Sequence, residues 1–333
     1  MIHKTMWIAQ QAALEATSQL ERAKVPWDQE IDVFSIIERS GLPLIFRPLK
    51  HLSGAYIPAS ESTNSRAGIL VNSNHPRTLQ RYTASHEYGH HIRDQTLSLD
   101  REFETEVEIL ERKQHLVLPE RERFAEVFAS WFLMPPQLVI NLQKRLGIDI
   151  TGSTPEDIYQ LALALGTSYR ATITQLVSLR MISWSQANRL RNWQPKEIKQ
   201  KISWSGLISA PRNDIWVITK KYNSFSIHPR VGDELLVCLP EAPSTGYIWV
   251  YKYLESTMTL TDQRFVETGA KLLGTGGLRE LRFKVEQANT LNLVLSMQRP
   301  WLREKSEADS FNVLLIVEED RLGINSEMLL VRT

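Results

Sequence analysis

The sequence RYTASHEYGHH at residues 81–91 contains the spacing His-Glu-x-x-His. It lies in a stretch whose pattern predicts a helix from about residue 78 to 95. Four residues advance a helix by about 400°, so His86 and His90 share one face, one turn apart. Two imidazoles at this spacing can reach one zinc ion, so the segment predicts a metal site on a helix. The alternative is a helix that carries two surface or core histidines.

Glu87 is expected to lie beside the metal rather than on it, because it is about 100° round the helix from His86. There its carboxylate can take a proton from the water that zinc activates and later deliver it to the leaving amine. Zinc acidifies that water enough for attack on a peptide carbonyl near neutral pH. His91 is about 140° from His86, which favours a structural or solvent-facing histidine. Glu87 is therefore the candidate catalytic residue.

A catalytic zinc site needs a third protein ligand and an open fourth position. Arg93 and Thr96 stand where a longer zinc motif would have Gly and His, so a downstream carboxylate is the remaining option. The candidate is Glu122, in a helix predicted over residues 121–134. Glu126 is four residues later, so one carboxylate can bind metal while the other holds a ligand imidazole. Alternatively, Glu122 is an exposed first-turn glutamate that favours the helix dipole.

Two of these segments together resemble the ImmA/IrrE family of zinc metallopeptidases. They are RYTASHE-x-GH and the later E-x-x-A-x-x-F-A-x-x-F-L-M-P, which begins at Glu122. The resemblance is specific over about residues 40–136 and looser to about 185. It implies an α+β zincin-like metallopeptidase domain, with Zn²⁺ on His86, His90 and Glu122 and with Glu87 catalytic. Family members are cytoplasmic proteases that cut helix-turn-helix repressors and so switch on stress, phage or mobile-element genes. Glu126 stands where the family usually has Asn or Asp.

The pattern changes near residue 200, from helical periods to short β runs separated by turn residues. Before that point it predicts helices at 8–22 and at 28–39, the second opened by Asp28, short strands at 44–46, 55–57 and 68–71, and a solvated helix or lid over the acidic residues 100–113. The spacing of the later β runs is typical of a β-sandwich of roughly 110 residues. We therefore predict a multidomain chain, with a metallopeptidase domain at 1–200 that includes a helical extension at about 150–195. A linker at about 195–212 leads to a β-sandwich domain at 212–320. The predicted strands are 215–219, 234–239, 248–253, 281–285, 291–297 and 311–317.

Three loops of the β region stand out, although each alone is typical of a turn, a Gly-rich hairpin or a strand end. The first loop has Pro243, Ser244, Thr245, Gly246 and Tyr247; the second has Gly274, Thr275, Gly276 and Gly277; the third has Arg299, Pro300 and Trp301.

In this order, the three loops resemble the chagasin family of cysteine-peptidase inhibitors, over about residues 212–318. The resemblance implies an immunoglobulin-like sandwich whose three loops cluster at one end and wedge into the cleft of papain-like enzymes. Ala242 stands where the family typically carries Asn, which removes a side chain that orders the first loop. Cys238, within a predicted strand, is expected to be a buried core residue rather than a nucleophile.

Composition excludes several other classes. The chain of 333 residues has 39 Lys and Arg against 38 Asp and Glu, so its net charge of +1 suggests neither nucleic acid nor an anionic membrane as partner. It lacks a long apolar run, and its start lacks the features of a signal peptide. One cysteine allows no internal disulfide and no cysteine-based zinc site. We predict a cytoplasmic protein.

The leading prediction is a zinc-dependent endopeptidase that cleaves a protein partner, such as a helix-turn-helix repressor, in a regulatory or stress response. Its C-terminal domain would bind proteins or inhibit a cysteine peptidase. One alternative is that the chain is primarily an inhibitor or partner of a papain-like or caspase-like cysteine peptidase. Another is a DNA-binding regulator that uses a helix pair and basic tail at 155–201, although direct DNA binding is disfavoured because packed helix pairs are common.

Overall fold

The computed structural model describes residues 2–62, 64–101, 119–203, 206, 210–251, 255–267, 276–301, 307–319 and 321–324. The chain divides into two compact units. The first unit contains residues 1–139, 165–175 and 320–333, and the second contains 140–164 and 176–319. The domain limits predicted from the sequence, 1–200 and 212–320, stay predictions.

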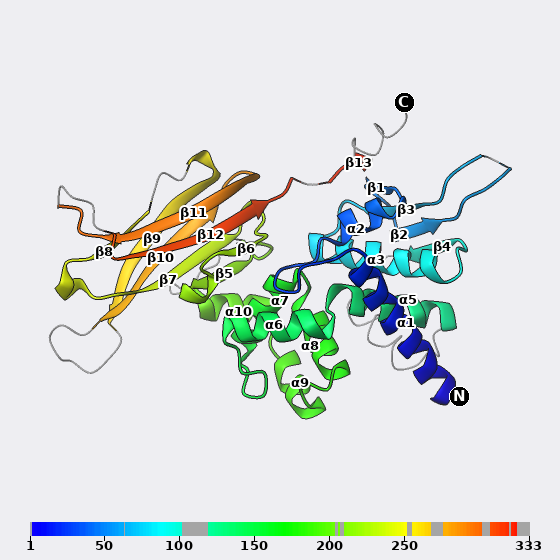
Figure 1. The fold of residues 1–333 in the computed structure, drawn as a ribbon, viewed down its shortest axis with the longest axis horizontal. Coiled ribbons are helices and arrows are strands. Elements are labelled where there is room, and N and C mark those ends of the chain that lie inside the picture. Colours follow the sequence, from blue (N-terminus) through cyan, green and yellow to red (C-terminus); the bar gives the residue numbers. More distant parts are fainter. Residues whose placement is uncertain are drawn as a thin grey trace. The chain divides into compact units, whose positions relative to one another are not determined.

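The first unit contains a five-stranded sheet in the order β13-β1-β3-β2-β4. Strands β1 and β3 are parallel, and the other neighbours are antiparallel. Strand β13 comes from the end of the chain and pairs with β1 near its beginning (Figure 1). The elements are α1 (Ile2–Arg22), α2 (Val33–Arg39), β1 (Leu44–Arg47), β2 (Leu52–Ile57), β3 (Gly68–Asn72), α3 (Arg77–Arg93), β4 (Ser98–Arg101), α5 (Glu120–Leu133) and β13 (Gly323–Ile324).

Most predicted elements of this unit are confirmed, with two exceptions. The second helix was predicted to begin at Asp28, but it begins at Val33. The reason is that Asp32 caps it, since its carboxylate accepts a hydrogen bond from Ser35 N at 3.1 Å. The acidic segment 100–113 was predicted as a solvated helix or lid; its start belongs to strand β4, and residues 102–118 lie outside the described residues.

Helix α3 is held in place by a buried arginine, Arg81, whose side chain is 1% exposed. Its guanidinium donates to Glu30 Oε1 at 2.5 Å, to the Ile31 carbonyl at 2.9 Å and to the Gly166 carbonyl at 3.0 Å. Removing one partner of such a buried pair costs about 3–5 kcal/mol, because the other charge stays buried without compensation. Arg81 therefore fixes the helix one turn before His86.

The second unit contains two four-stranded sheets, β5-β7-β10-β9 and β6-β12-β11-β8. Tyr251 of β8 meets Phe283 of β10 edge to face, at 5.8 Å between ring centroids. The strands are β5 (Ile215–Thr219), β6 (Phe225–Ile227), β7 (Glu234–Glu241), β8 (Ile248–Tyr251), β9 (Met258–Glu267), β10 (Gly277–Val285), β11 (Asn289–Gln298) and β12 (Asp309–Val317). The helices that precede them are α6 (Pro136–Leu146), α7 (Pro155–Leu165), α8 (Tyr169–Ser178), α9 (Trp184–Arg191) and α10 (Pro195–Ile202), of which α6 to α8 cross the unit boundary.

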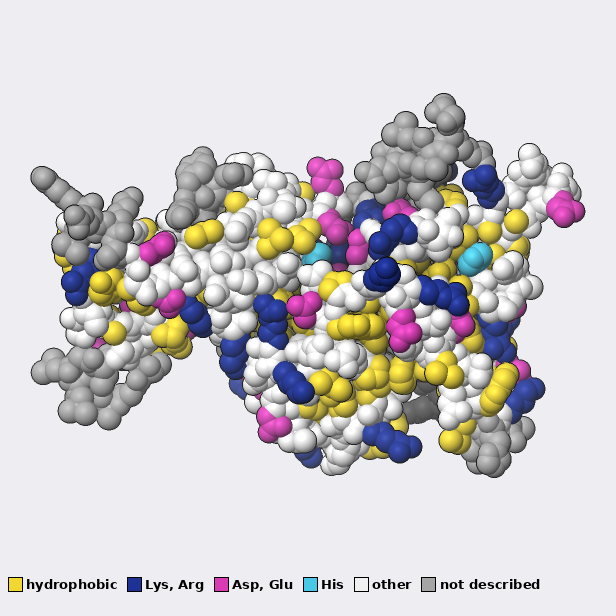
Figure 2. All heavy atoms as spheres, viewed as in Figure 1, with side chains coloured by type: hydrophobic (Ala, Val, Ile, Leu, Met, Phe, Trp, Pro, Cys, Tyr) yellow, Lys and Arg dark blue, Asp and Glu magenta, His cyan; other side chains and the backbone are white. Residues whose placement is uncertain are grey.

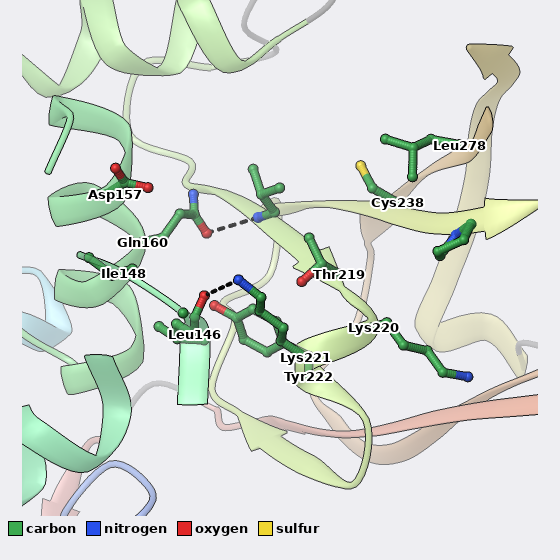
Figure 3. A pocket seen from close by; sticks show the side chains of 13 residues that line it. Leu146, Ile148, Asp157, Gln160, Thr219, Lys220, Lys221, Tyr222, Cys238 and Leu278 are labelled. Atoms are coloured by element: carbon green, nitrogen blue, oxygen red, sulfur yellow. Dashed lines mark hydrogen bonds between the residues drawn. The ribbon is translucent and has the colours of Figure 1, made fainter. Parts of the chain in front are cut away.

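Within the second unit, helix α7 covers the free edge of strand β5 (Figure 3). The amide of Gln160 donates to the Ile215 carbonyl and accepts from Val217 N, both at 2.9 Å. Lys221 Nζ donates to the Leu146 carbonyl at 3.0 Å, which ties the end of α6 to the same region. These bonds satisfy backbone groups that an edge strand otherwise leaves unpaired. Part of the predicted helical extension is thereby joined to the β region.

A hollow of about 390 Å³ lies between these helices and the sheet, and Cys238 lines it (Figure 3). Cys238 is 9% exposed. Burial raises the pKa of its thiol to about 12. The thiol is therefore protonated at neutral pH, in agreement with the core role predicted for this residue.

The surface carries no strong field of one sign on the face drawn in Figure 2, where basic and acidic side chains of the described residues are interspersed. Among the helices that the structure describes, none is both long and apolar enough to cross a membrane.

Candidate functional sites

The three predicted metal ligands meet at one point of the first unit. His86 and His90 of α3 have their Nε2 atoms 3.2 Å apart. Glu122 of α5 places Oε2 at 3.4 Å from His86 Nε2 and at 3.5 Å from His90 Nε2. An ion bound tetrahedrally at about 2.05 Å from each ligand holds those ligand atoms about 3.3 Å apart. Two imidazoles and a carboxylate at these separations fit one zinc ion.

Helices α3 and α5 hold the ligands through an aromatic contact between them. Tyr88 lies between the two histidines in the sequence, and its ring is 5.8 Å from that of Phe128 and 5.7 Å from that of Phe132. All three rings are nearly or fully inaccessible to solvent. Burying a large side chain of this kind stabilises the fold by about 1.5–3 kcal/mol. The packing thus fixes the axes from which the ligands project.

Electrostatics at the ligands favour cation binding. Hydrogen bonds from His86 and His90 hold the pKa of Glu122 well below its usual range. Burial lowers the pKa of His86, but the charge of Asp100 and the hydrogen bond to Glu122 outweigh it and raise the pKa to about 9. An ion must therefore displace a proton from this imidazole, so the affinity for metal falls as the pH falls.

Glu87 is fully buried next to the ligands. Neither of its carboxylate oxygens has a hydrogen-bond partner in the part of the chain that the structure describes. Burial raises the pKa of Glu87 to about 7. A carboxyl group whose pKa lies near neutral pH can both accept and return a proton, as a general base and acid must.

Glu126 is the predicted site residue that the structure does not bring into contact with the metal ligands. Among the described residues, no hydrogen bond joins its carboxylate to either imidazole. Its charge acts instead on Tyr82, whose pKa is raised well above its usual value by burial and then by Glu126. The Tyr82 ring lies 6.0 Å from that of His86. The predicted role of Glu126 in holding an imidazole stays a prediction.

Strand β4 adds a carboxylate, Asp100, that the sequence analysis did not single out. Asp100 pairs with Gly54 of β2. A Cβ on Gly54 would lie 2.3 Å from Thr83 Cγ2 and 3.8 Å from Glu87 Cγ, so β2 packs directly on α3 at the site. No sequence signal could have indicated it, because alternation in this segment would place Leu97 and Leu99 inward, whereas the structure exposes both leucines and buries Ser98.

The first and third predicted loops of the β region contact each other. Arg299 donates to the Thr245 carbonyl from Nε at 3.1 Å and from a terminal nitrogen at 2.8 Å, and its guanidinium lies 4.5 Å from the centroid of Tyr247. Gly246 has φ +77°, and a Cβ there would lie 2.9 Å from Trp301 Cζ2. Trp301 is 66% exposed, and Pro243, Ser244 and Pro300 are exposed beside it.

The described end of the second loop meets the start of the first. A Cβ on Gly276 would lie 3.3 Å from the Glu241 carbonyl and 3.9 Å from Ala242 Cβ, and Gly277 pairs with Glu241. Gly274 and Thr275 lie outside the described residues. The first loop is ordered without the asparagine that Ala242 replaces, because Thr245 N and Oγ1 both donate to the Ala242 carbonyl, at 3.0 and 2.7 Å.

Models of two protein families each match one part of the chain. Residues 37–175 match the IrrE N-terminal-like domain of the M78 peptidases. Residues 229–314 match the chagasin family peptidase inhibitor I42. The chain joins an IrrE-like domain to a chagasin-like domain. His86, Glu87, His90 and Glu122 all fall within the IrrE-like match, and the three loops fall within the chagasin-like match.

Individual relatives match the chagasin-like domain. Chagasin of Trypanosoma cruzi is 27% identical over 103 residues, which are 29% of this chain and 94% of chagasin. Amoebiasin-2 of Entamoeba histolytica is 25% identical over 122 residues, 36% of this chain and 99% of its own. Among solved structures, the cysteine protease inhibitor EhICP2 from Entamoeba histolytica aligns with a TM-score of 0.31 at 24% identity, covering 33% of this chain and all of its own. PbICP-C, solved in complex with falcipain-2, aligns with a TM-score of 0.25 at 18% identity, covering 32% of this chain and 92% of its own.

Proposed function

We propose that the IrrE-like domain is a zinc-dependent endopeptidase of the zincin-like class. The observation that carries this proposal is the separation of 3.2–3.5 Å among one atom each of His86, His90 and Glu122, with the buried Glu87 beside them. The substrate proposed is a protein partner in the cytoplasm, and the family resemblance favours a helix-turn-helix repressor whose removal starts a regulatory or stress response.

In this mechanism, His86, His90 and Glu122 hold the zinc ion. Bound zinc supplies the Lewis acidity that activates water and polarises the scissile carbonyl. Glu87 accepts the proton of the attacking water and passes it to the leaving amine. Burial raises the proton affinity of Glu87 to a pKa of about 7 and outweighs the charge of His86 and the Ser98 hydroxyl, which both lower it.

Removing zinc is expected to abolish cleavage. We expect the metal-free protein, prepared with a chelator and dialysed, to cleave a proteome-derived peptide library at least about 100-fold more slowly. The reason is that the Lewis acidity of zinc stabilises the transition state by several kcal/mol. One equivalent of zinc should restore the rate and magnesium should not. Full cleavage by metal-free protein would contradict the proposal.

A second function is favoured by the loop cluster. We propose that the chagasin-like domain, an immunoglobulin-like sandwich, inhibits papain-like cysteine peptidases by inserting its loops into their cleft. Gly246 allows the backbone to turn sharply, and the exposed Trp301 offers a large contact area at little cost in conformational entropy. The hydrogen bonds from Arg299 to Thr245 order the loop before binding, which reduces the entropy lost on binding.

Titration of the full chain against papain tests this second function. We expect stoichiometric, reversible inhibition that is the same for zinc-loaded and metal-free protein, because the loops contain no metal ligand. The chain should remain intact on a gel, which distinguishes an inhibitor from a substrate. Papain that stays fully active at high micromolar concentrations of the chain would reject direct inhibition.

The contacts do not favour DNA recognition through 155–201. Lys199 is buried and donates to the carbonyls of Pro211 and Asn213, at 2.7 and 2.8 Å. Lys201 forms an ion pair with Glu156 at 2.6 Å. Two of the cations that suggested a DNA surface are therefore engaged within the second unit.

A further inference from the structure

Asp100 lies on the face of the sheet that is turned toward the metal helix. Its partner in β2 is Gly54, and two residues along the same strand pair Tyr56 faces Ser98. The Tyr56 hydroxyl lies 3.1 Å from His91 Nδ1 of α3, so Tyr56 lies on the face of the sheet that packs against α3. Residues directly opposite in an antiparallel pair project to the same side of the sheet. Asp100 therefore projects toward the helix that carries Glu87.

The carboxylate of Asp100 forms no ion pair in the described part of the chain, although its charge acts on the imidazole of His86. No Lys, Arg or His there lies within ion-pair distance of it, and no donor there makes a hydrogen bond to it. The neighbouring cation Arg121 pairs with other carboxylates: its Nε is 3.5 Å from Glu122 Oε1 and 3.7 Å from Asp94 Oδ2. Asp100 is half-buried, so its charge is only partly screened by water.

Among the described residues, the charges at the site leave an excess of negative charge even with zinc in place, as long as Glu87 is ionised to act as the base. Zinc contributes two positive charges, the two ligand imidazoles are neutral, Glu122 and Asp100 contribute one negative charge each, and ionised Glu87 contributes a third. Arg121 is shared between Glu122 and Asp94 and so does not compensate Asp100. A half-buried carboxylate without a partner is costly unless a ligand brings the opposite charge.

Among the described residues, strand β4 also leaves one side of this group open. It is the last strand in its sheet, so among the described strands its outer edge has no neighbour. Leu99 points away from α3 and is 59% exposed, in agreement with an inward direction for Asp100. An extended substrate lying near the zinc ligands can therefore approach Asp100 without displacing a described strand.

We propose that Asp100 determines substrate specificity by binding a cationic nitrogen of the substrate next to the scissile bond. The nitrogen belongs either to a Lys or Arg side chain or to a free amino terminus. This inference rests on the proposed peptidase function of the same site. It assigns to Asp100 direct contact with the substrate, which is distinct from proton transfer by Glu87.

The test compares matched peptides with the zinc-loaded full chain and with the D100N variant. The best peptide from the library is synthesised with Arg or with citrulline, its neutral analogue, at the residues that flank the cleaved bond. Each peptide is made with a free and with an acetylated amino terminus, so that the two sources of the cation are separated. The D94N variant, which removes one negative charge at the end of α3, is the control, and zinc content is measured for every protein.

We expect the unmodified chain to prefer the cationic peptide by about 10- to 100-fold in kcat/KM, since this is the range for a charge-assisted hydrogen bond. D100N should lose that preference and cleave the neutral peptide as before, whereas D94N should keep it.

Absence of a preference in the unmodified chain overturns the inference and leaves the peptidase function intact. An equal loss by D100N on all peptides also overturns it, because Asp100 would then act through Glu87 or His86. If no peptide is cleaved by any zinc-loaded protein, the peptidase function itself fails. The citrulline comparison needs no variant, so it decides the matter even if D100N does not fold.

Discussion

The E87Q variant is expected to cleave about 10²- to 10⁴-fold more slowly than the unmodified chain while it binds zinc equally well. Glutamine has the shape of glutamate but cannot accept the proton of the attacking water. Because Glu87 contributes no atom to the ligand set of His86, His90 and Glu122, the substitution leaves the metal site intact. Steady-state kinetics on one peptide substrate, together with the zinc content of the same sample, measure both effects.

The matched control for this variant is E126Q. Glu126 is also a glutamate near the site, but among the described residues it makes no hydrogen bond to the imidazoles. Its loss should change the rate by less than about 10-fold, which is below the range of about 10- to 100-fold for residues that hold a metal ligand. Cleavage by E87Q at the rate of the unmodified chain would reject the assigned mechanism. Loss of zinc from E87Q would show that Glu87 is needed for the site to form.

The G246V variant is expected to weaken inhibition of papain by about 100-fold or more. At φ +77° a β-branched residue is strained, and a Cβ would lie 2.9 Å from Trp301 Cζ2. The loop and the indole must therefore move apart, and a displaced aromatic anchor of an interface costs about 2–4 kcal/mol. The inhibition constant for papain measures the effect, and peptide cleavage by the IrrE-like domain should not change.

G232V is a control with a similar backbone defect. Gly232 has φ +91° and precedes strand β7, whereas the loop that contains Gly246 follows the end of that strand. Both variants should lower the thermal stability of the second unit, but G232V should inhibit papain as well as the unmodified chain. Equal inhibition by both variants would mean that the loop geometry does not decide the affinity.

The sequence predicted the positions of His86 and His90 better than those of the residues around them. Helical periodicity alone places His86 and His90 on one face, since spacing within a helix is a local property. The residues alone left two roles open for Glu122, a metal ligand or an exposed first-turn glutamate, because they do not show how α5 packs against α3. Its assignment as a ligand needed the family resemblance. Asp100 was not predicted because β4 has only four residues, and its pairing with β2 decides which of its side chains face α3.

In the second unit, six of the eight described strands were predicted, whereas β6, β9 and the contacts of the helical extension were not. The pattern around Gln160 predicts a helix and says nothing of the strand edge that its amide covers. Similarly, the resemblance to the chagasin family implied that the loops cluster, but the hydrogen bonds from Arg299 to Thr245 join residues far apart in the chain. Such contacts leave no periodic signal in a single sequence.

The central claim is that one ion binds to His86, His90 and Glu122. The most direct test is X-ray diffraction from crystals of the zinc-loaded chain, collected on both sides of the zinc absorption edge. We predict one anomalous peak per chain, about 2.0–2.2 Å from an Nε2 atom of each histidine and from a carboxylate oxygen of Glu122. A zinc peak at other residues, or zinc-saturated crystals with no peak among these three side chains, would contradict the account.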